Sequence, residues 1–556
     1  MNDGTVGVTI EGREVFAIPG SPLNEVLANF DLAADGNGDP VVIGVVNGQR
    51  TSLFEPLWGG ETVGLMHLSH PKSHSTVERT LCSTLAMACD EVFPDHSMII
   101  DFSYGGGMFC RLRRDTKITA AELAGVEERM RDLIARDLVF TPRVYGQRTL
   151  IRLLRNSKRR YSRLAARHVP TGSAVYCRVE GSRLLFQGLH LPSTGMLKSF
   201  TLHLEPPGFV LLPGQAGRPD VPTPYAPQPK LFETMLDYSA WTDHQGIGDL
   251  GSINQMVSQG RVKELVGTCE TRHEQAVVSI AHRVADLPDR GRLVLIAGPS
   301  SSGKTTFAKR LALQLRVMRL KPFALSLDNY FVDRRDTPRD EGGAYDYETL
   351  EALKLDLLNE HLPALLAGRE VHLPLYDFAT GTSVLQDEPT RLEPGAPLLV
   401  EGIHALNPAL GAGVDRQQCL RVYVSALCNT NSEDIAYMPT RLTRLYRRIV
   451  RDAQFRGYTA GVTLQRWRSV REGERKHIFP YQQNADVFFN TGLAYELGVL
   501  KLWAEPRLAA VSPEDPSYGR ARALLDFLAL HLPMDARLVP PTSLLREFIG
   551  GSSFTY

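Results

Sequence analysis

The stretch from Gly298 to Thr306 holds the residues of this chain whose types and spacing are best suited to chemistry. Its residues are, in order, Gly298, Pro299, Ser300, Ser301, Ser302, Gly303, Lys304, Thr305 and Thr306. They match the phosphate-binding pattern G-x-x-x-x-G-K-[ST] at every fixed position, as a chance glycine- and serine-rich loop rarely does. In such a loop backbone N–H groups bind phosphate oxygens, Lys304 reaches the terminal phosphates, and the Thr305 hydroxyl ligates Mg²⁺.

The segments on either side of the loop fit the strand and helix that the motif requires. Residues 293–297 (Leu-Val-Leu-Ile-Ala) are all apolar and predict a buried strand, and residues 307–318 predict a helix. We therefore expect a nucleoside triphosphate, most simply Mg²⁺-ATP, to bind here.

Two acids end further apolar segments. Asp328 follows Ala324-Leu-Ser-Leu, and Glu401 follows Leu398-Leu-Val. Carboxyl ends of parallel strands meet at the crevice where such sheets bind ligands. There Asp328 is expected to take a proton from an attacking hydroxyl or to orient it, and Glu401 to contact Mg²⁺ directly or through water. The alternative for Asp328 is a turn-forming role.

Two further features are candidates for substrate contacts. Tyr376 and Phe378 stand on a predicted loop, where their rings either stack on a flat substrate or simply pack. Arginines recur three and four residues apart on one predicted helix face: Arg441, Arg444, Arg448 and Arg451, followed by Arg456 and Gly457. Such a stripe is often only solvated, but arginines that converge on a transferring phosphoryl group supply the charge that its transition state needs.

Together these motifs resemble the uridine kinase/phosphoribulokinase family from about residue 290 to about residue 500. The resemblance implies that Asp328 is the base and that Lys304, Arg448 and Arg451 assist catalysis. It also implies that Asp346 and the Tyr376–Phe378 loop contact the substrate together with Arg448, and that Thr305 and Glu401 bind the metal. Arg456 is expected to contact ATP as part of a lid.

Three positions depart from the uridine kinase pattern. Gly381 stands where those enzymes usually have His, Tyr458 follows Arg456-Gly457 in place of a second Arg, and Arg466 replaces a Gln that contacts the base. We expect Gly381 to leave space where an imidazole would donate to the base. Because specificity rests on hydrogen bonds to buried polar groups, these changes predict an altered base preference, with purine nucleosides among the candidates.

The N-terminal half resembles a different family. Residues 78–88 and 187–195 resemble the second additional domain of threonyl-tRNA synthetases, and residues 4–66 resemble the ubiquitin-like TGS module before it. In the synthetase that domain edits mischarged tRNA with two helical His, a later Cys and a later His. Here Arg79, Ser83 and Phe186 stand at the first three positions, and His190 remains. One ligand does not hold zinc, so neither stoichiometric zinc nor editing by that route is expected.

Two local patterns in this half have simpler explanations. His70 and His74 are four residues apart after His67, but Pro71 intervenes, so capping or surface positions are favoured over a metal site. The basic run Arg148–Arg167 predicts a solvated amphipathic helix, with RNA contact as the alternative.

Composition sets the broad class. The chain has 556 residues, 62 basic and 62 acidic, so no global polyanion-binding field is expected. Its seven cysteines form no CxxC pair, no apolar run is long enough to span a membrane, and the first residues do not resemble a signal peptide. We expect a reduced, cytoplasmic protein without membrane contact.

These signals predict an α/β protein with a P-loop parallel-sheet domain behind a β-grasp module and an α+β domain. The predicted domains are a TGS-like module (1–66), a synthetase-like region (67–215), a linker and helical region (216–285, with a Pro-rich linker at 219–229), the P-loop domain (286–504) and a helical tail (505–556). The expected function is ATP-dependent phosphorylation of a sugar hydroxyl, most simply the 5′-hydroxyl of a nucleoside. The alternatives are a phosphoribulokinase-like sugar-phosphate kinase and an RNA- or ribosome-associated nucleotide switch.

Overall fold

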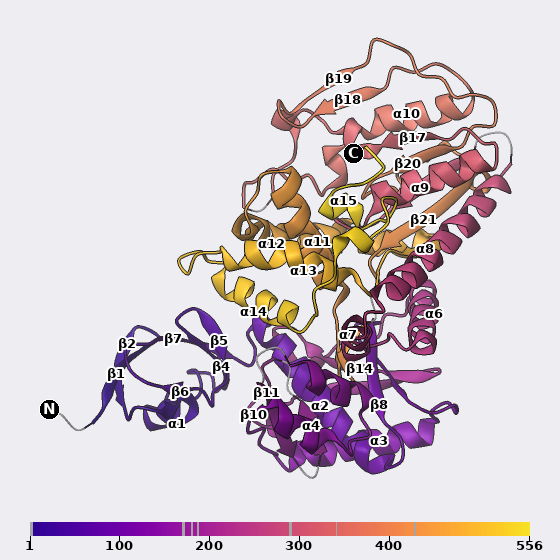
Figure 1. Ribbon diagram of the computed structural model, residues 1–556. Coiled ribbons are helices and arrows are strands. Elements are labelled where there is room, and N and C mark those ends of the chain that lie inside the picture. The colour runs from indigo at the N-terminus through magenta and orange to yellow at the C-terminus, as the bar shows by residue number, and fades with distance from the viewer. Residues whose placement is uncertain are drawn as a thin grey trace.

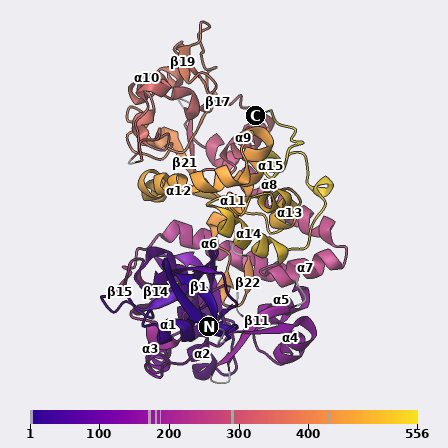
Figure 2. The ribbon, with the colours of Figure 1, turned by 90° about the vertical axis from the view of Figure 1, so that its left-hand side faces the viewer.

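The computed structural model describes residues 4–169, 173–179, 182–185, 188–288, 292–340, 342–427 and 430–555, without the side chains of 173–178 and 182–183. A small N-terminal module projects from the side of an elongated body, in which a parallel-sheet part and an antiparallel-sheet part are stacked end to end (Figure 1, Figure 2). Within the described part of the chain, no helix combines the length and the apolar composition that crossing a membrane requires.

The N-terminal module is a mixed sheet that covers one helix. The strands are β1 (Val6–Ile10), β2 (Arg13–Ala17), β4 (Val41–Val46), β5 (Gln49–Thr51) and β7 (Thr62–His67), with the short pair β3 (Ser21–Pro22) and β6 (Pro56–Leu57) beside them. The sheet order is β2-β1-β7-β4-β5, and β1 and β7 are parallel. Its helix is α1 (Leu23–Asn29), whose apolar side chains complete the core of the module.

The second region is an antiparallel sheet with helices on one face. Its main sheet has the order β13-β14-β9-β8, and β15 pairs with β14. Its elements are α2 (His74–Val92), β8 (Met98–Tyr104), β9 (Gly107–Leu112), α3 (Ala120–Ala135), β10 (Arg143–Gly146), α4 (Gln147–Leu154), α5 (Arg160–Ala165), β11 (Ser173–Val179), β12 (Ser182–Leu185), β13 (Phe200–Glu205), β14 (Gly208–Gln215) and β15 (Arg218–Pro222). The helices α2 and α3 pack on this sheet around one apolar core.

Three predictions for these regions need correction. The Pro-rich linker begins as strand β15, because Arg218–Pro222 pairs with β14. The basic run forms two short helices, α4 and α5, in place of one. Between them Arg159 is buried and bonded to Asp90, so this run is not uniformly solvated.

The P-loop part is built on a five-stranded, wholly parallel sheet of order β17-β20-β16-β21-β24. Its strands are β16 (Leu293–Ala297), β17 (Phe323–Ser326), β20 (Leu398–Glu401), β21 (Cys419–Ser425) and β24 (Val487–Asn490). β16 is buried along its whole length, as expected for a central parallel strand covered on both faces. Its helices are α9 (Lys304–Val317), α10 (Leu355–Leu366), α11 (Thr440–Phe455), α12 (Ala460–His477) and α13 (Glu496–Ala509), and a hairpin of β18 (Pro374–Asp377) and β19 (Thr382–Leu385) lies at one end.

Segments from both ends of the P-loop part extend the body. Before it lie α6 (Pro229–Gln245), α7 (Leu250–Ser258) and α8 (Val262–Ala285). After it come α14 (Tyr518–Ala529), as predicted, and the single-turn α15 (Arg546–Ile549). The apolar residues of this C-terminal segment belong to the same core as α9 and α11, so it is an integral layer of the P-loop part.

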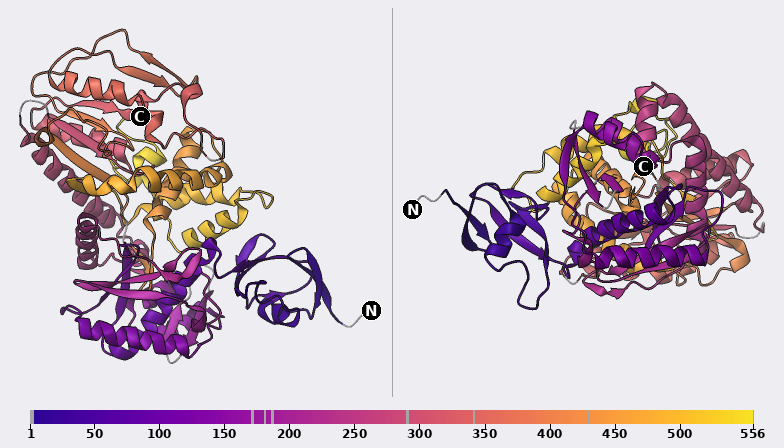
Figure 3. Two further views of the ribbon diagram at one scale, coloured as in Figure 1. Left: turned by 180° about the vertical axis from the view of Figure 1, so that it is seen from behind. Right: turned by 90° about the horizontal axis from the view of Figure 1, so that it is seen from below.

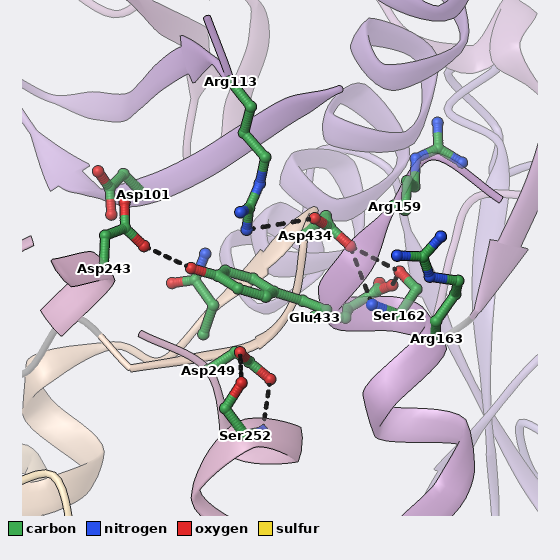
Figure 4. Close-up of polar contacts among 12 residues, drawn as sticks. Asp101, Arg113, Arg159, Ser162, Arg163, Asp243, Asp249, Ser252, Glu433 and Asp434 are labelled. Atoms are coloured by element: carbon green, nitrogen blue, oxygen red, sulfur yellow. Dashed lines mark hydrogen bonds and ion pairs between the residues drawn. The ribbon is translucent and has the colours of Figure 1, made fainter. Parts of the chain in front are cut away.

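A hairpin of the P-loop part joins it to the second region. It consists of β22 (Asn431–Glu433) and β23 (Ala436–Tyr437), and the Ile100 N–H donates to the carbonyl oxygen of Asp434 at 2.9 Å. The Ser162 hydroxyl donates to the Glu433 carboxyl at 2.7 Å, and the Ser162 N–H to the Asp434 carboxyl at 2.9 Å (Figure 4). Polar groups far apart in sequence thus form a buried joint between the two halves.

Candidate functional site

The phosphate loop follows β16 directly, and α9 begins at Lys304. A Cβ at Gly298 would lie 1.9 Å from the Val424 carbonyl oxygen, so only glycine fits beside β21. Ser301 adopts a positive φ of 58°, and the hydroxyls of Ser301 and Ser302 are buried without a hydrogen-bond partner among the described residues. The loop therefore curves around a space lined by hydroxyl donors that have no partner among the described residues. Such a loop suits phosphate oxygens.

Arginines of helix α11 donate hydrogen bonds to the backbone of this loop. Arg444 donates to the Ser300 carbonyl oxygen at 3.2 Å, and Arg447 donates to the Ser302 carbonyl oxygen at 3.3 Å. Both arginines are buried, and each is ion-paired with a buried glutamate. The predicted arginine face thus has more than one role: Arg444 supports the loop, whereas the residues further along the helix lie at the site.

Three arginines of the predicted lid converge on one carboxylate. Asp452 is 2% exposed and lies 3.2 Å from Arg448, 2.9 Å from Arg451 and 3.6 Å from Arg456. Arg448 also donates to the Ser300 hydroxyl at 2.7 Å, so the group reaches the phosphate loop. Our reading of the sequence assigned no role to Asp452, although it directly follows Arg451.

Asp328 lies at the same edge of the sheet, two residues beyond the end of β17. It belongs to a 3-10 turn, Leu327–Tyr330, so the strand ends earlier than predicted. Asp328 is an exposed residue, yet desolvation by the surrounding protein raises the pKa of its carboxyl. The charges of Lys304, Arg456 and Arg451 oppose that rise. The predicted base, the loop lysine and two lid arginines therefore face one another.

Glu401 ends β20, as predicted, and pairs in register with Ile296 of β16. The Thr305 hydroxyl donates to its carboxylate at 3.1 Å. Desolvation raises the pKa of Glu401 to about 7, and the neighbouring charge of Asp328 adds to this while Lys304 opposes it. A hydroxyl and a carboxylate at this spacing form a set of hard oxygen donors that fits Mg²⁺.

Glu348 is a third acid at the site, and no sequence motif pointed to it. Desolvation and then the charge of Glu474 raise its pKa to about 7, while Arg448 and Lys304 lower it. Its Oε2 atom is buried with no hydrogen-bond partner among the described residues. The predicted ribose-contacting Asp346 is adjacent, since its carboxylate accepts from the Glu348 N–H at 2.9 Å.

The predicted aromatic loop forms a cluster next to the Asp328 turn. Phe331 lies 5.6 Å from Tyr376 and 6.4 Å from Phe378, measured between ring centroids. Tyr376 is buried, whereas Phe378 is 61% exposed. Tyr376 thus packs within this cluster, and most of the Phe378 side chain is exposed.

The three positions that depart from the uridine kinase pattern lie in two places. Gly381 has a φ of 75°, and a Cβ there would lie 2.7 Å from the guanidinium carbon of Arg334. The predicted vacant space at Gly381 is therefore wrong, because Arg334 fills it. Tyr458 and Arg466 face each other, with the guanidinium carbon 4.5 Å from the ring centroid.

The C-terminal segment also reaches the phosphate loop. The Thr306 hydroxyl donates to the Glu547 carboxylate at 2.6 Å, and Leu544 lies directly against Gly303. The Glu547 carboxylate thus lies at the N-terminal end of α9, where a nucleotide phosphate is expected to bind. No motif links residues this far apart, so this contact could not be predicted from the sequence.

In the N-terminal half, His190 meets the helix predicted to align with the editing site. Its Nε2 lies 3.0 Å from the Ser83 hydroxyl, and desolvation and then Arg79 lower its pKa to about 3. Phe186, the third position compared, lies outside the described residues. Among described residues, no group of three or more His, Cys, Asp and Glu side chains is arranged to hold a metal ion. His70 caps the turn before α2 by accepting from the Lys72 N–H, as predicted.

Comparisons with known proteins agree with the motifs of the P-loop part. A sequence model of the phosphoribulokinase/uridine kinase family matches residues 293–496. A uridine kinase of Chloroflexus aurantiacus is 30% identical over 202 residues, which cover 36% of this chain and 87% of that protein. A uridine kinase of Halobacterium salinarum is 30% identical over 198 residues, 35% of this chain and 79% of that protein.

Solved structures give weaker likenesses. A possible uridine kinase from Bacillus stearothermophilus is 21% identical, with a TM-score of 0.27 and coverage of 40% of this chain and 100% of that one. A putative fructose transport system kinase from Silicibacter sp. TM1040 is 16% identical, with a TM-score of 0.26 and coverage of 38% and 98%. TM-scores this low add nothing to the fold assignment.

A parallel α/β sheet with a P-loop, acids at its carboxyl edge and an arginine-bearing helix defines a kinase-type phosphate site. Through residues 293–496 the chain belongs to the phosphoribulokinase/uridine kinase family.

Proposed function

We propose that this protein is an ATP-dependent kinase that transfers a γ-phosphoryl group to a sugar hydroxyl, most specifically the 5′-hydroxyl of a nucleoside. The observation that carries the proposal is the position of Asp328 just beyond the end of β17, where the charges of Lys304, Arg456 and Arg451 act on its carboxyl. A carboxylate that faces phosphate-binding cations serves an acceptor hydroxyl, whereas a nucleotide switch has no need of it.

In the proposed reaction Asp328 takes the proton from the acceptor hydroxyl as the hydroxyl oxygen bonds to the γ-phosphorus. The bond between the γ-phosphorus and the oxygen that bridges to the β-phosphate breaks, and ADP is released. The raised pKa makes Asp328 a better base than an ordinary carboxylate. Lys304, Arg448 and Arg451 stabilise the negative charge on the transferring group, and Arg456 helps close the lid over ATP.

Thr305 and Glu401 are the residues that would hold Mg²⁺, since their oxygens are 3.1 Å apart beside the loop. When bound, Mg²⁺ neutralises charge on the β- and γ-phosphates. Glu401 must be ionised to bind it, and its raised pKa of about 7 predicts weaker metal affinity in mild acid.

For the acceptor we propose contacts from Asp346, Arg448, Tyr376 and Phe378. The exposed Phe378 ring offers a stacking face, and Asp346 offers a carboxylate for ribose hydroxyls. Pyrimidine and purine nucleosides both remain candidates for the acceptor. A sugar-phosphate acceptor is the second candidate, because Arg334 donates to the Phe378 carbonyl oxygen at 2.7 Å and brings a cation to the acceptor side.

For the N-terminal half we propose a TGS-like β-grasp module at residues 1–66 and a synthetase-like region at 67–215. The central parallel pair of β1 and β7, with one helix against the sheet, supports the first. The meeting of His190 with the Ser83 position of α2 supports the second.

One assay tests the kinase proposal. Purified protein is given Mg²⁺-ATP with uridine, cytidine, adenosine, guanosine, inosine, ribulose 5-phosphate or no acceptor, and ADP and phosphorylated product are measured. Nucleoside 5′-phosphate formation is expected, and Asp328→Asn should reduce kcat by about 10²- to 10⁴-fold with little change in ATP affinity. The control is Asp356→Asn, an exposed acid on α10. Phosphorylation of ribulose 5-phosphate alone would select the second candidate, and ATP binding without acceptor turnover would favour the switch.

A further inference from the structure

Five arginines from separate parts of the chain gather where the N-terminal module meets the body. They are Arg50 in β5, Arg79 in α2, Arg441 in α11, Arg471 in α12 and Arg520 in α14, and all five are exposed. None belongs to the kinase-type site described above, and we call them the junction arginines. Figure 3 shows the indigo N-terminal module next to the yellow C-terminal helices near the middle of the body.

One contact links the N-terminal module to α14, and a second links α14 to α12. The Gly48 carbonyl oxygen lies 2.8 Å from where Gly519 would carry a Cβ, so the β4–β5 turn lies against the start of α14. Arg520 then donates to the Leu464 carbonyl oxygen of α12 at 3.5 Å. These contacts bring the side chains of Arg50 and Arg520 into one neighbourhood.

Other contacts bring α2 and α11 to the same place. Arg50 donates to the Lys72 carbonyl oxygen, at 3.4 Å, just before α2. Tyr437 of β23 packs on the core that includes α2, and α11 begins at Thr440. Arg441, in the first turn of α11, is therefore held close to Arg79 of α2.

The positive charges of the junction arginines interact with one another. Desolvation and then the charges of Arg471, Arg441 and Arg50 lower the pKa of Arg520 to about 10. Desolvation and then Arg441 likewise lower the pKa of Arg471. Desolvation lowers the pKa of Arg79, and Arg441 adds to this while Glu78 opposes it. Mutual repulsion of this kind is unfavourable unless an anion is present.

Neighbouring acids offset part of this positive charge, but each is paired more closely with another residue. Glu78 lies 3.3 Å from His74, and Glu472 lies 3.1 Å from Arg468. Glu474 is buried and paired with Arg444. Across the described ranges, none of the junction arginines has a carboxylate oxygen within 4.0 Å, so the positive charge remains available.

We propose that the junction arginines bind the phosphodiester backbone of RNA. Guanidinium groups form paired hydrogen bonds with phosphate oxygens and are weakly hydrated. Both properties suit them to bind a phosphodiester backbone. The five are exposed and spread over several elements, so they match an extended anion better than a single enclosed phosphate. The chain as a whole carries no net formal charge, so the junction is a local excess of cations.

The test measures binding of full-length protein to a fluorescein-labelled RNA hairpin by anisotropy, at several salt concentrations and without nucleotide. Binding is expected to weaken steeply with salt, with a log–log slope of roughly −0.7 to −0.9 for each phosphate contact. Arg441→Gln and Arg520→Gln should each weaken binding and reduce the slope by about 1, and the double variant should reduce it by about 2.

Controls distinguish this surface from general attraction to anions. Arg468→Gln changes an exposed arginine on α12 that is already paired, and it should leave RNA affinity unchanged. Thermal unfolding of each variant shows whether it is folded, and kinase turnover should match that of the wild type. The proposal is overturned if the hairpin does not bind, if the Arg441 and Arg520 variants bind it normally, or if poly-glutamate or ATP competes as well as unlabelled RNA.

Discussion

Asp452 gives the arginine helix its geometry at the candidate site. Three guanidinium groups lie within 3.6 Å of its carboxylate, which is almost completely buried. Without an anion between them, Arg448, Arg451 and Arg456 would repel one another and spread apart. The carboxylate thus acts as a positioning residue, holding ready the charge that a phosphoryl group requires.

We therefore expect Asp452→Asn to lower kcat by about 10²-fold, because a shift of roughly 1 Å in charged groups at a reacting centre has effects of that size. The KM for ATP should also rise, since Arg456 loses its anchor. Steady-state kinetics with the preferred acceptor measure both, and Asp356→Asn is the control. Wild-type kcat in the folded variant would show that the arginines hold their places without this carboxylate.

Gly381 illustrates how a backbone conformation can override a motif comparison. Its φ of 75° is one that side chains rarely adopt, and Arg334 occupies the space beside it. A histidine at this position would meet both obstacles at once.

Gly381→His is expected to destabilise the protein by about 1–3 kcal/mol and to give no preference for uridine. Gly343→His is the matched control: it has a φ of 81° with nothing within 4 Å of a Cβ, so it carries the backbone strain without displacing a side chain. Denaturant unfolding and kcat/KM across the nucleosides are the measurements. A large gain in uridine preference from Gly381→His would mean that the Arg334 side chain gives way readily.

At the scale of elements, the C-terminal segment makes a contact that we expect to oppose nucleotide binding. Glu547 places a negative charge on Thr306, at the N-terminal end of α9. A helix N-terminus favours anions, so the carboxylate and a nucleotide phosphate compete for the same donors.

Glu547→Gln should therefore lower the KM for ATP about three- to tenfold, given the ~0.3–2 kcal/mol that an anion typically gains at a helix N-terminus. The amide oxygen can still accept from the Thr306 hydroxyl, so the packing of α15 should survive. Glu505→Gln, on an exposed position of α13, serves as control. A higher KM in Glu547→Gln would instead assign Glu547 a supporting role in the phosphate site.

These elements also show what could be predicted from sequence. The P-loop, the strands ending near Asp328 and Glu401, and helix α11 followed from local patterns, because one strand, turn or helix fixes each of them. The roles of Glu348 and Glu547 could not be predicted, since packing between distant segments creates their surroundings. The division of labour between Arg444 and Arg448 was missed for the same reason: burial and an ion pair, invisible in the spacing, separate them.

At the scale of the whole molecule, the two halves meet through buried acids. Glu433 and Asp434 belong to the hairpin of the P-loop part, Asp249 caps the start of α7, and Ser162 lies on α5 (Figure 4). Arg113 lies 3.7 Å from the Asp434 carboxylate. Desolvation raises the pKa of Glu433 to about 8 and that of Asp249 to about 6, and it raises the pKa of Asp434 as well.

A raised carboxyl pKa makes the joint dependent on pH in a definite direction. The folded state keeps a proton on Glu433 that the unfolded chain releases near pH 4.3, so stability is fully present below that pH and falls as pH rises toward about 8. Glu433→Gln keeps an oxygen to accept from Ser162 but cannot ionise. We expect wild-type unfolding free energy to decline between pH 5 and pH 8 more steeply than that of Glu433→Gln, by up to about 1.4 kcal/mol per pH unit. Denaturant titrations across this range measure the difference. Parallel profiles for the two proteins would mean that Glu433 is ionised in the folded joint, with Arg159 and its other neighbours supplying the compensating charge.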